Sequence, residues 1–139
     1  MYGWPWFLAE FDEDSDVVAP DVVSAFHLAL RERAGSWPCE PTHTEFVSPS
    51  PPGRDWCAVL DVISPARSIT EITVGVCFDG SRIRASEVHN QNYHPLSACQ
   101  SRVEIMEATG TPEELAGIAA DWFEALMARY HPETQARRQ

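Results

Sequence analysis

The sequence contains no lysine. All ten of its basic residues are arginine, and twenty-one Asp and Glu residues leave a formal net charge of −11 over 139 residues. Nucleic acids and anionic membrane surfaces are bound through basic faces that neutralise phosphate. The charge balance therefore argues against either as the main partner and favours a basic protein as the partner.

Long apolar runs and a basic leader are also lacking. No window reaches the ~18 apolar residues that a membrane-spanning helix needs, and the apolar start over residues 1–9 does not have the pattern of a secretory signal. We therefore expect a cytoplasmic protein. The apolar fraction of 44% and charged fraction of 22% are ordinary for a globular chain. The length suits a single domain, expected over residues 1–132, with residues 133–139 as a frayed tail.

Closely spaced cysteines and catalytic signatures are missing as well. The four cysteines are Cys39, Cys57, Cys77 and Cys99. No two lie near enough in the sequence to form a zinc knuckle or a redox motif, and we expect free buried thiols, although two disulfides remain possible. There is no Gly-x-Ser-x-Gly turn, no glycine-rich phosphate loop and no His-Glu-x-x-His. The sequence thus predicts a fold class and does not identify a reaction.

The pattern of apolar and turn residues predicts the element order β-α-β-β-β-β-α. Strands are expected at residues 4–11, 56–63, 69–78, 82–89 and 102–108, and helices at residues 20–34 and from 111 to about 130. The proline-rich stretch over residues 37–53 is expected to be an irregular crossing, with brief pairing possible at 42–47. The sum is a two-layer α+β domain, with a mainly antiparallel sheet of about five strands and two amphipathic helices on one face.

Two local patterns predict the start of the second helix and the turn between two strands. Thr111, Pro112 and Glu114 form a capping box ahead of an apolar stripe with three- and four-residue spacing. Asp79-Gly80 is a hairpin turn signal. Before it, apolar residues at 72, 74, 76 and 78 alternate with more polar ones, which is typical of a strand with one buried face.

Three arrangements could carry chemistry. His89, His94 and Cys99 recur five residues apart and have ligand types that suit zinc, although the spacing matches no familiar zinc motif. A second arrangement would pair any of the four cysteines with His27, His43, His89 or His94. It requires an exposed, low-pKa thiolate, whereas Cys57 and Cys77 fall inside apolar strands. We therefore expect no resident metal or cofactor.

Paired carboxylates are the third arrangement. Glu71 and Glu87 on the predicted hairpin, or Glu104 and Glu107 on the last predicted strand, could act as an acid and a base if their surroundings separated their pKa values. Charged residues on a solvated sheet face account for them equally well.

Other polar residues favour recognition. Asp12, Glu13, Asp14 and Asp16 form an acidic run that could accelerate capture of a basic partner. The amide- and tyrosine-bearing loop Asn90-Gln91-Asn92-Tyr93-His94 offers adaptable hydrogen-bonding groups, and we expect Asn92, Tyr93 and His94 to contact the partner.

Trp37 lies in the proline-rich crossing with no obvious buried face, and we expect it to contact the partner.

The C-terminal quarter carries a resemblance. Arg102-Val103-Glu104-Ile105, Thr109 through Leu115, and Asp121-Trp122-Phe123-Glu124 resemble small acidic proteins from high-GC bacterial genomes, and the absence of lysine agrees with such a source. Several such proteins resemble immunity proteins of polymorphic toxin systems, which neutralise a toxin by direct binding. The resemblance implies an immunity or antitoxin role and transfers no binding residue. A small Cys/His- or Glu-dependent hydrolase or transferase, or a ligand-binding component of a larger assembly, remains an alternative.

Overall fold

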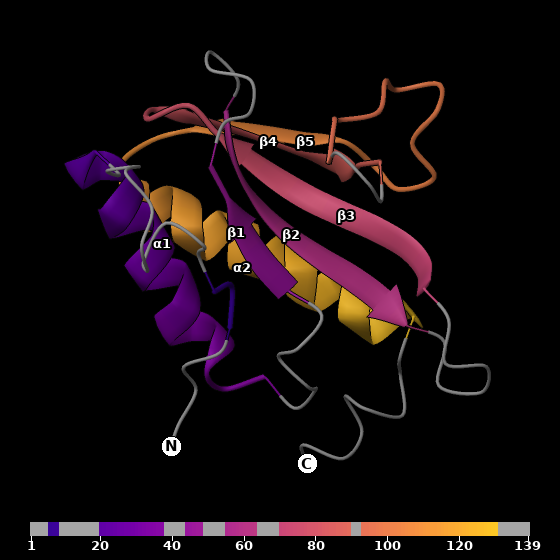
Figure 1. Cartoon of the computed structure of the whole chain (residues 1–139), viewed down its shortest axis with the longest axis horizontal. Helices are drawn as coiled ribbons and strands as arrows, with labels where there is room; N and C mark the ends of the chain where they lie inside the picture. Colours follow the sequence, from indigo (N-terminus) through magenta and orange to yellow (C-terminus); the bar gives the residue numbers. More distant parts are fainter. Residues whose placement is uncertain are drawn as a thin grey trace.

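The computed structural model describes residues 6–8, 20–37, 44–48, 55–63, 70–89 and 93–130. These form one five-stranded antiparallel sheet and two helices (Figure 1). In chain order the elements are α1 (Asp21–Ala34), β1 (Thr44–Val47), β2 (Trp56–Ile63), β3 (Thr70–Phe78), β4 (Arg82–Glu87), β5 (Met106–Thr109) and α2 (Pro112–Tyr130). The strands lie side by side in sequence order, so every connection within the sheet joins neighbours. The expected α+β layout is confirmed.

The two helices cover one face of the sheet. In Figure 1, α2 passes behind the strands and α1 lies beside it. From α1, Phe26 stacks on Phe78 of β3 with ring centroids 4.4 Å apart, and from α2 Phe123 is fully buried. Alternate strand residues meet these side chains, so the apolar stripes of both helices and one face of the sheet form the main core. Neither helix is long and apolar enough to cross a membrane, and the rest of the described chain adds no such helix.

The predicted capping box is confirmed. The backbone N–H of Thr111 donates to Glu114 Oε1 at 2.9 Å, and the backbone N–H of Glu114 donates to Thr111 Oγ1 at 3.1 Å. The hydrogen bond from Thr111 also lowers the pKa of the Glu114 carboxyl. Helix α2 therefore begins where the sequence predicts.

The predicted first strand is wrong over its described residues. Residues 6–8 form a turn, with Phe7 at a φ of 50°, and the remainder of 4–11 lies outside the described residues. The fifth strand is β1, which lies in the proline-rich crossing at the place where brief pairing over residues 42–47 was expected to be possible. Phe46 explains the difference, because its buried ring stacks on His27 at 4.2 Å while its N–H donates to Leu8 O at 2.9 Å. Aromatic residues favour strands, but they favour a buried turn equally well.

The sheet also departs from the prediction on its second face. β3 is buried on both sides from Ile72 onward, because Cys57, Val59 and Cys77 form a smaller cluster on the face away from the helices. Val47 and Tyr93 pack against that cluster. The alternation of polar and apolar residues therefore marks two different buried environments, and not one buried face and one solvated face.

The last strand begins later than predicted. β5 covers Met106–Thr109, whereas the expected strand began at residue 102. Arg102 instead belongs to the connection from β4, where it binds Glu87.

Candidate functional site

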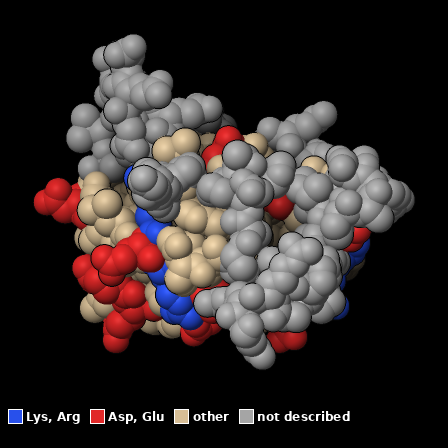
Figure 2. All heavy atoms as spheres, turned by 90° about the horizontal axis from the view of Figure 1, so that it is seen from below, with Lys and Arg blue, Asp and Glu red and all other residues tan. Residues whose placement is uncertain are grey.

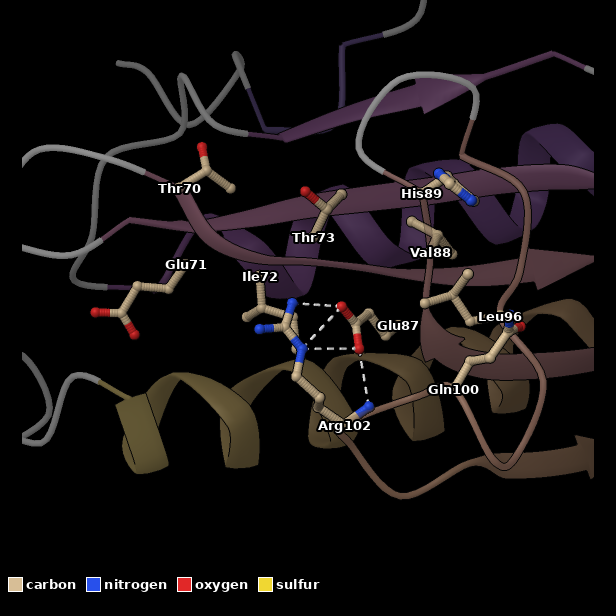
Figure 3. A pocket seen from close by; sticks show the side chains of 10 residues that line it. All are labelled: Thr70, Glu71, Ile72, Thr73, Glu87, Val88, His89, Leu96, Gln100 and Arg102. Carbon is tan, nitrogen blue, oxygen red and sulfur yellow. Dashed lines mark hydrogen bonds and ion pairs between the residues drawn. The ribbon is translucent and has the colours of Figure 1, made fainter.

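A polar pocket of about 330 Å³ opens where β3 begins and β4 ends (Figure 3). The connection from β4 to β5 folds back along it through Leu96, Gln100 and Arg102. The lining residues are Thr70, Glu71, Ile72, Thr73, Glu87, Val88, His89, Leu96, Gln100 and Arg102. Its volume is at the lower end of the range found for small-molecule sites.

Glu87 is the buried charge of this pocket. It follows Ile83 and Ala85 on the apolar face of β4 and is only 6% exposed, so its carboxylate needs a partner. Arg102 supplies it: the backbone N–H donates to Oε1 at 2.8 Å, Nε lies 3.1 Å from Oε2, and a guanidinium nitrogen bonds to Oε2. Ser101 Oγ accepts the backbone N–H of Glu87 at 3.1 Å. Figure 3 shows the arginine lying across the carboxylate.

This geometry fixes the charge state of Glu87. Burial raises the pKa of the Glu87 carboxyl, but the hydrogen bonds and charge of Arg102 outweigh burial and hold the pKa below its ordinary value. The carboxylate is therefore ionised at neutral pH, with both oxygens bonded to Arg102. Such a group is a poor proton donor, so the arrangement suits binding of a polar molecule better than acid–base chemistry.

The two predicted carboxylate pairs have different outcomes. Glu71 and Glu87 do line this one pocket, in unlike surroundings, since Glu71 is exposed and Glu87 is buried. They do not face one another across the hairpin, because Val74 is the residue opposite Glu87. Glu107 lies 3.6 Å from Arg82 in an ion pair on the sheet surface. Glu104 is not part of this ion pair and lies at a second pocket of about 300 Å³ between β5 and α2.

That second pocket is lined mainly by apolar side chains. Its apolar lining residues are Met106, Trp122, Ala125 and Leu126, and Glu104 and Arg129 also line it. Trp122 is only partly buried, because its side chain packs against the core and also lines this pocket.

Among the described residues the predicted histidine and cysteine arrangements are not assembled, and Cys39 and His43 lie outside that part of the chain. His89 and His94 are both exposed and are joined through their backbones, the N–H of His89 donating to His94 O at 3.0 Å. Cys99 is exposed, with its Sγ 3.3 Å from Ser97 Oγ. Among the residues that the structure describes, no three His, Cys, Asp or Glu side chains come close enough together to hold a metal ion.

The buried candidates lie on opposite faces of the sheet. His27 is on the helix side, where its Nε2 donates to Phe7 O at 2.6 Å. Cys57 and Cys77 lie on the other face with their sulfur atoms 3.5 Å apart. His27 therefore has a structural role between α1 and the turn at residues 6–8, and it does not face these two cysteines.

Trp37 corrects the expectation of a surface contact. It is only 6% exposed, its ring meets Trp6 edge-on at 5.0 Å, and its Nε1 donates to Glu124 Oε2 at 2.7 Å. The reason is that α1 ends at Ala34 with Gly35 as its C-cap, and the chain after it brings Trp37 against Glu124 of α2. Trp37 therefore belongs to the core.

Of the other residues predicted to contact a partner, only some lie within the described part of the chain. Asp12, Glu13, Asp14, Asp16 and Asn92 lie outside the described residues. Tyr93 is half-buried against the cluster around Cys57 and Cys77, at a φ of 57°, and His94 is exposed. Only His94, and the outer part of Tyr93, thus present described surface to a partner.

The described surface over the helices is acidic. In Figure 2, Asp and Glu side chains gather along one side of the lower face, beside a short line of arginine. On α2, Glu113, Glu114 and Asp121 are exposed, and Asp121 keeps 70% of its side chain accessible. Arg33 of α1 bridges to Asp121 at 2.6 Å and to Glu124 at 2.9 Å, which ties the two helices together.

Sequence reasoning missed the ion pair between Glu87 and Arg102. A signal was present, because a carboxylate that alternates with Ile83 and Ala85 on a buried strand face requires a cation. Nothing in the spacing names Arg102 as that cation, since fifteen positions separate the two residues.

Comparisons with known proteins add no relative to this description. A scan against family models, a search of the curated proteins and a search of the solved structures each found no match. What can be concluded about function therefore depends on the geometry and charge of the chain itself.

Proposed function

We propose that this chain is a non-enzymatic, acidic protein-binding module of the immunity or antitoxin type, which neutralises a basic toxin by direct binding in the cytoplasm. The observation that carries the proposal is the charge. A net charge of −11 without a single lysine produces a negative potential that attracts a cationic partner and repels nucleic acid.

The helix side supports this proposal. α2 contains four acidic residues and Arg129 as its single basic residue, and three of the four acids are exposed. The fourth, Glu124, accepts hydrogen bonds from Arg33 and Trp37, so it helps to hold the two helices in place. A rigid helix pair that presents carboxylates to solvent is well suited to meet a basic surface, because little side-chain and backbone order has to be gained on binding.

Within this proposal the predicted contacts have separate roles. Asp12, Glu13, Asp14 and Asp16 steer the approach of the partner, while Asn92, Tyr93 and His94 supply short-range hydrogen bonds. Tyr93 packs on the face of the sheet away from the helices, so contacts there and charge on the helices can be altered independently.

The experiment begins with the partner. The product of the neighbouring gene in the native host is the first candidate; it is expressed alone and with this chain, and rescue of cell growth together with co-purification supports neutralisation by binding. Growth arrest that persists although both proteins are produced, with no complex recovered, would reject the proposal.

A matched pair of variants then tests the steering role. One variant changes Asp12, Glu13, Asp14 and Asp16 to lysine, and its control changes four scattered acids, namely Glu32, Glu45, Glu71 and Glu104. Both replace four negative charges by four positive ones. We expect the association rate to fall at least ~10-fold in the first variant and distinctly less in the control. Equal losses would mean that net charge, and not the acidic run, governs capture.

The polar pocket favours a second candidate function, a ligand-binding component of a larger assembly. Its hydroxyl, amide and imidazole groups suit a small polar molecule. A thermal-shift screen of small polar metabolites tests this, with Thr70→Val as the variant that should weaken a genuine hit.

A further inference from the structure

Cys57 and Cys77 are direct neighbours in the centre of the sheet. They are paired residues of β2 and β3, twenty positions apart in the sequence, and their Sγ atoms are 3.5 Å apart. Both are free thiols, and they are 5% and 7% exposed. Nothing in the proposed binding function uses them.

The hydrogen-bond pattern of the sheet places the two thiols in the closer kind of cross-strand pair. Val88 N–H donates to Thr73 O at 2.9 Å, so Thr73 directs its backbone groups toward β4. Cys77 lies four positions further along β3, and because alternate residues of a strand direct their backbone groups to the same side, those of Cys77 also point toward β4. It therefore makes no ladder hydrogen bond with Cys57, and in such pairs the Cα atoms lie about 4.5 Å apart with the side chains close together. Disulfides span Cα separations of about 4.4 to 6.8 Å, so this pair falls within their range.

The surroundings leave room for the sulfur atoms and little else. Gly75 lies beside the pair, and a Cβ at that position would come within 2.9 Å of Cys57 Sγ. Val59 completes the cluster, and Tyr93 packs against it. Closing the pair needs an approach of about 1.5 Å by the two sulfurs, which is within reach of side-chain rotation. Because the pair is buried, only a small oxidant suits it.

We propose that Cys57 and Cys77 form an oxidative modification site, in which a hydroperoxide converts the two thiols into a disulfide that links β2 to β3. Cys77 attacks the peroxide O–O bond, which breaks to give Cys77 sulfenic acid and one molecule of alcohol or water. The Cys57 sulfur then attacks the Cys77 sulfur, and its proton leaves with the sulfenic oxygen as a second molecule of water. Two thiols are oxidised by two electrons, and the hydroperoxide is reduced by two electrons.

The roles of the two cysteines follow from their contact. The hydrogen bond between them, together with burial, raises the pKa of the Cys57 thiol, while the same hydrogen bond lowers the pKa of Cys77. Since the thiolate is the nucleophile, Cys77 reacts first and Cys57 resolves the sulfenic acid. Cys99 is the internal comparison, because it is exposed and has no thiol beside it among the described residues.

The test treats the folded, full-length chain with hydrogen peroxide at increasing dose. Non-reducing digestion and mass spectrometry should recover a peptide linking Cys57 to Cys77, and the intact monomer should lose two hydrogens. Dithiothreitol should reverse both changes. The oxidised form should melt about 5 to 10 °C higher than the reduced form, because the bond closes a loop of about twenty residues.

Variants and the unfolded chain provide the controls. Cys77→Ala should abolish the linked peptide, and Cys99→Ser should leave it unchanged. Since Cys77→Ala could impair folding, the wild-type chain is also oxidised in guanidinium chloride, where pairing should become mixed among all four cysteines. The proposal fails if Cys57 and Cys77 still alkylate as thiols at a dose that oxidises Cys99. It also fails if their linkage forms no more selectively in the folded chain than in the unfolded one.

Discussion

Replacing Arg102 by methionine should destabilise the protein through Glu87. The variant keeps the length and apolar stem of the side chain but removes the guanidinium that bonds to both carboxylate oxygens. Only the backbone N–H of residue 102 then still donates to Oε1. The Glu87 side chain keeps just 8% of its accessible area, so few water molecules can reach the carboxylate to replace the lost hydrogen bonds.

The expected loss of stability depends on the burial of Glu87 and on the exposure of Arg102. Breaking a fully buried ion pair costs about 3 to 5 kcal/mol, because a buried charge is left without compensation. The Arg102 side chain is 62% exposed, so part of the attraction is already screened by solvent. We therefore expect the free energy of unfolding to fall by about 2 to 3 kcal/mol at neutral pH, which lowers the melting midpoint by about 6 to 10 °C.

The loss should depend on pH in a defined direction. In the wild-type chain the pKa of Glu87 lies below its unfolded value, so its stabilising contribution is complete above the unfolded pKa and is lost as the pH falls through the folded pKa. Without Arg102, burial alone acts and raises the folded pKa above the unfolded value. The unpaired buried carboxylate then lowers the free energy of unfolding of the variant at neutral pH. Protonation of Glu87 at lower pH removes this destabilisation. The stability difference should narrow as the pH is lowered from 7 toward about 5.

Urea unfolding followed by circular dichroism measures the stability difference between the wild-type chain and Arg102→Met at each pH. The Glu87→Gln variant supplies the control. In the Glu87→Gln background the same Arg102→Met change should cost less than about 1 kcal/mol and show no such pH dependence, since no buried charge remains. An equal cost in both backgrounds would refute the reasoning, because the arginine would then act through packing alone.

Three smaller predictions concern two glycines and the cap of α2, and they can be checked by the same unfolding experiments. Gly117→Ala should stabilise the chain by up to about 1 kcal/mol, because Gly117 lies inside α2 and a Cβ there meets nothing within 4 Å; a loss would contradict this. Gly75→Ala should destabilise it by about 1 to 3 kcal/mol, because the new Cβ meets Cys57 Sγ, and the cost should shrink when Cys57 is also alanine. Thr111→Ala should cost about 1 kcal/mol by removing the side-chain acceptor at the start of α2, and an unchanged midpoint would show that the cap contributes nothing.

The helices could be predicted because their signals are local. Pro112 after a capping threonine fixes the start of α2, and apolar residues at helical spacing fix the face that it buries. The hairpin between β3 and β4 was also predictable, since Gly80 adopts a φ of 112° that the Asp-Gly signal implies.

The first strand and Trp37 could not be predicted, because tertiary packing decides them. An aromatic segment such as Trp6-Phe7 fits an edge strand or a buried turn equally well, and only the presence of Phe46 and Trp37 at the same place selects the turn. The burial of Trp37 depends on where the chain goes after α1, which no local pattern records.

In the candidate site, too, local features could be predicted from the sequence and tertiary contacts could not. The need of Glu87 for a cation could be recognised from strand alternation, but its pairing with Arg102 depends on how the connection after β4 folds back. Likewise, each of Cys57 and Cys77 has the pattern of a packing residue within a strand. Their contact depends on the register between β2 and β3, which the connection between those strands does not specify in its sequence.

The measurement that tests the central claim most directly is the association rate of the wild-type chain with its captured partner as a function of ionic strength. If negative surface potential drives recognition, the logarithm of the association rate constant should fall steeply as salt is raised from about 20 to 300 mM, while the dissociation rate changes little. An association rate that stays constant over this range would contradict the account.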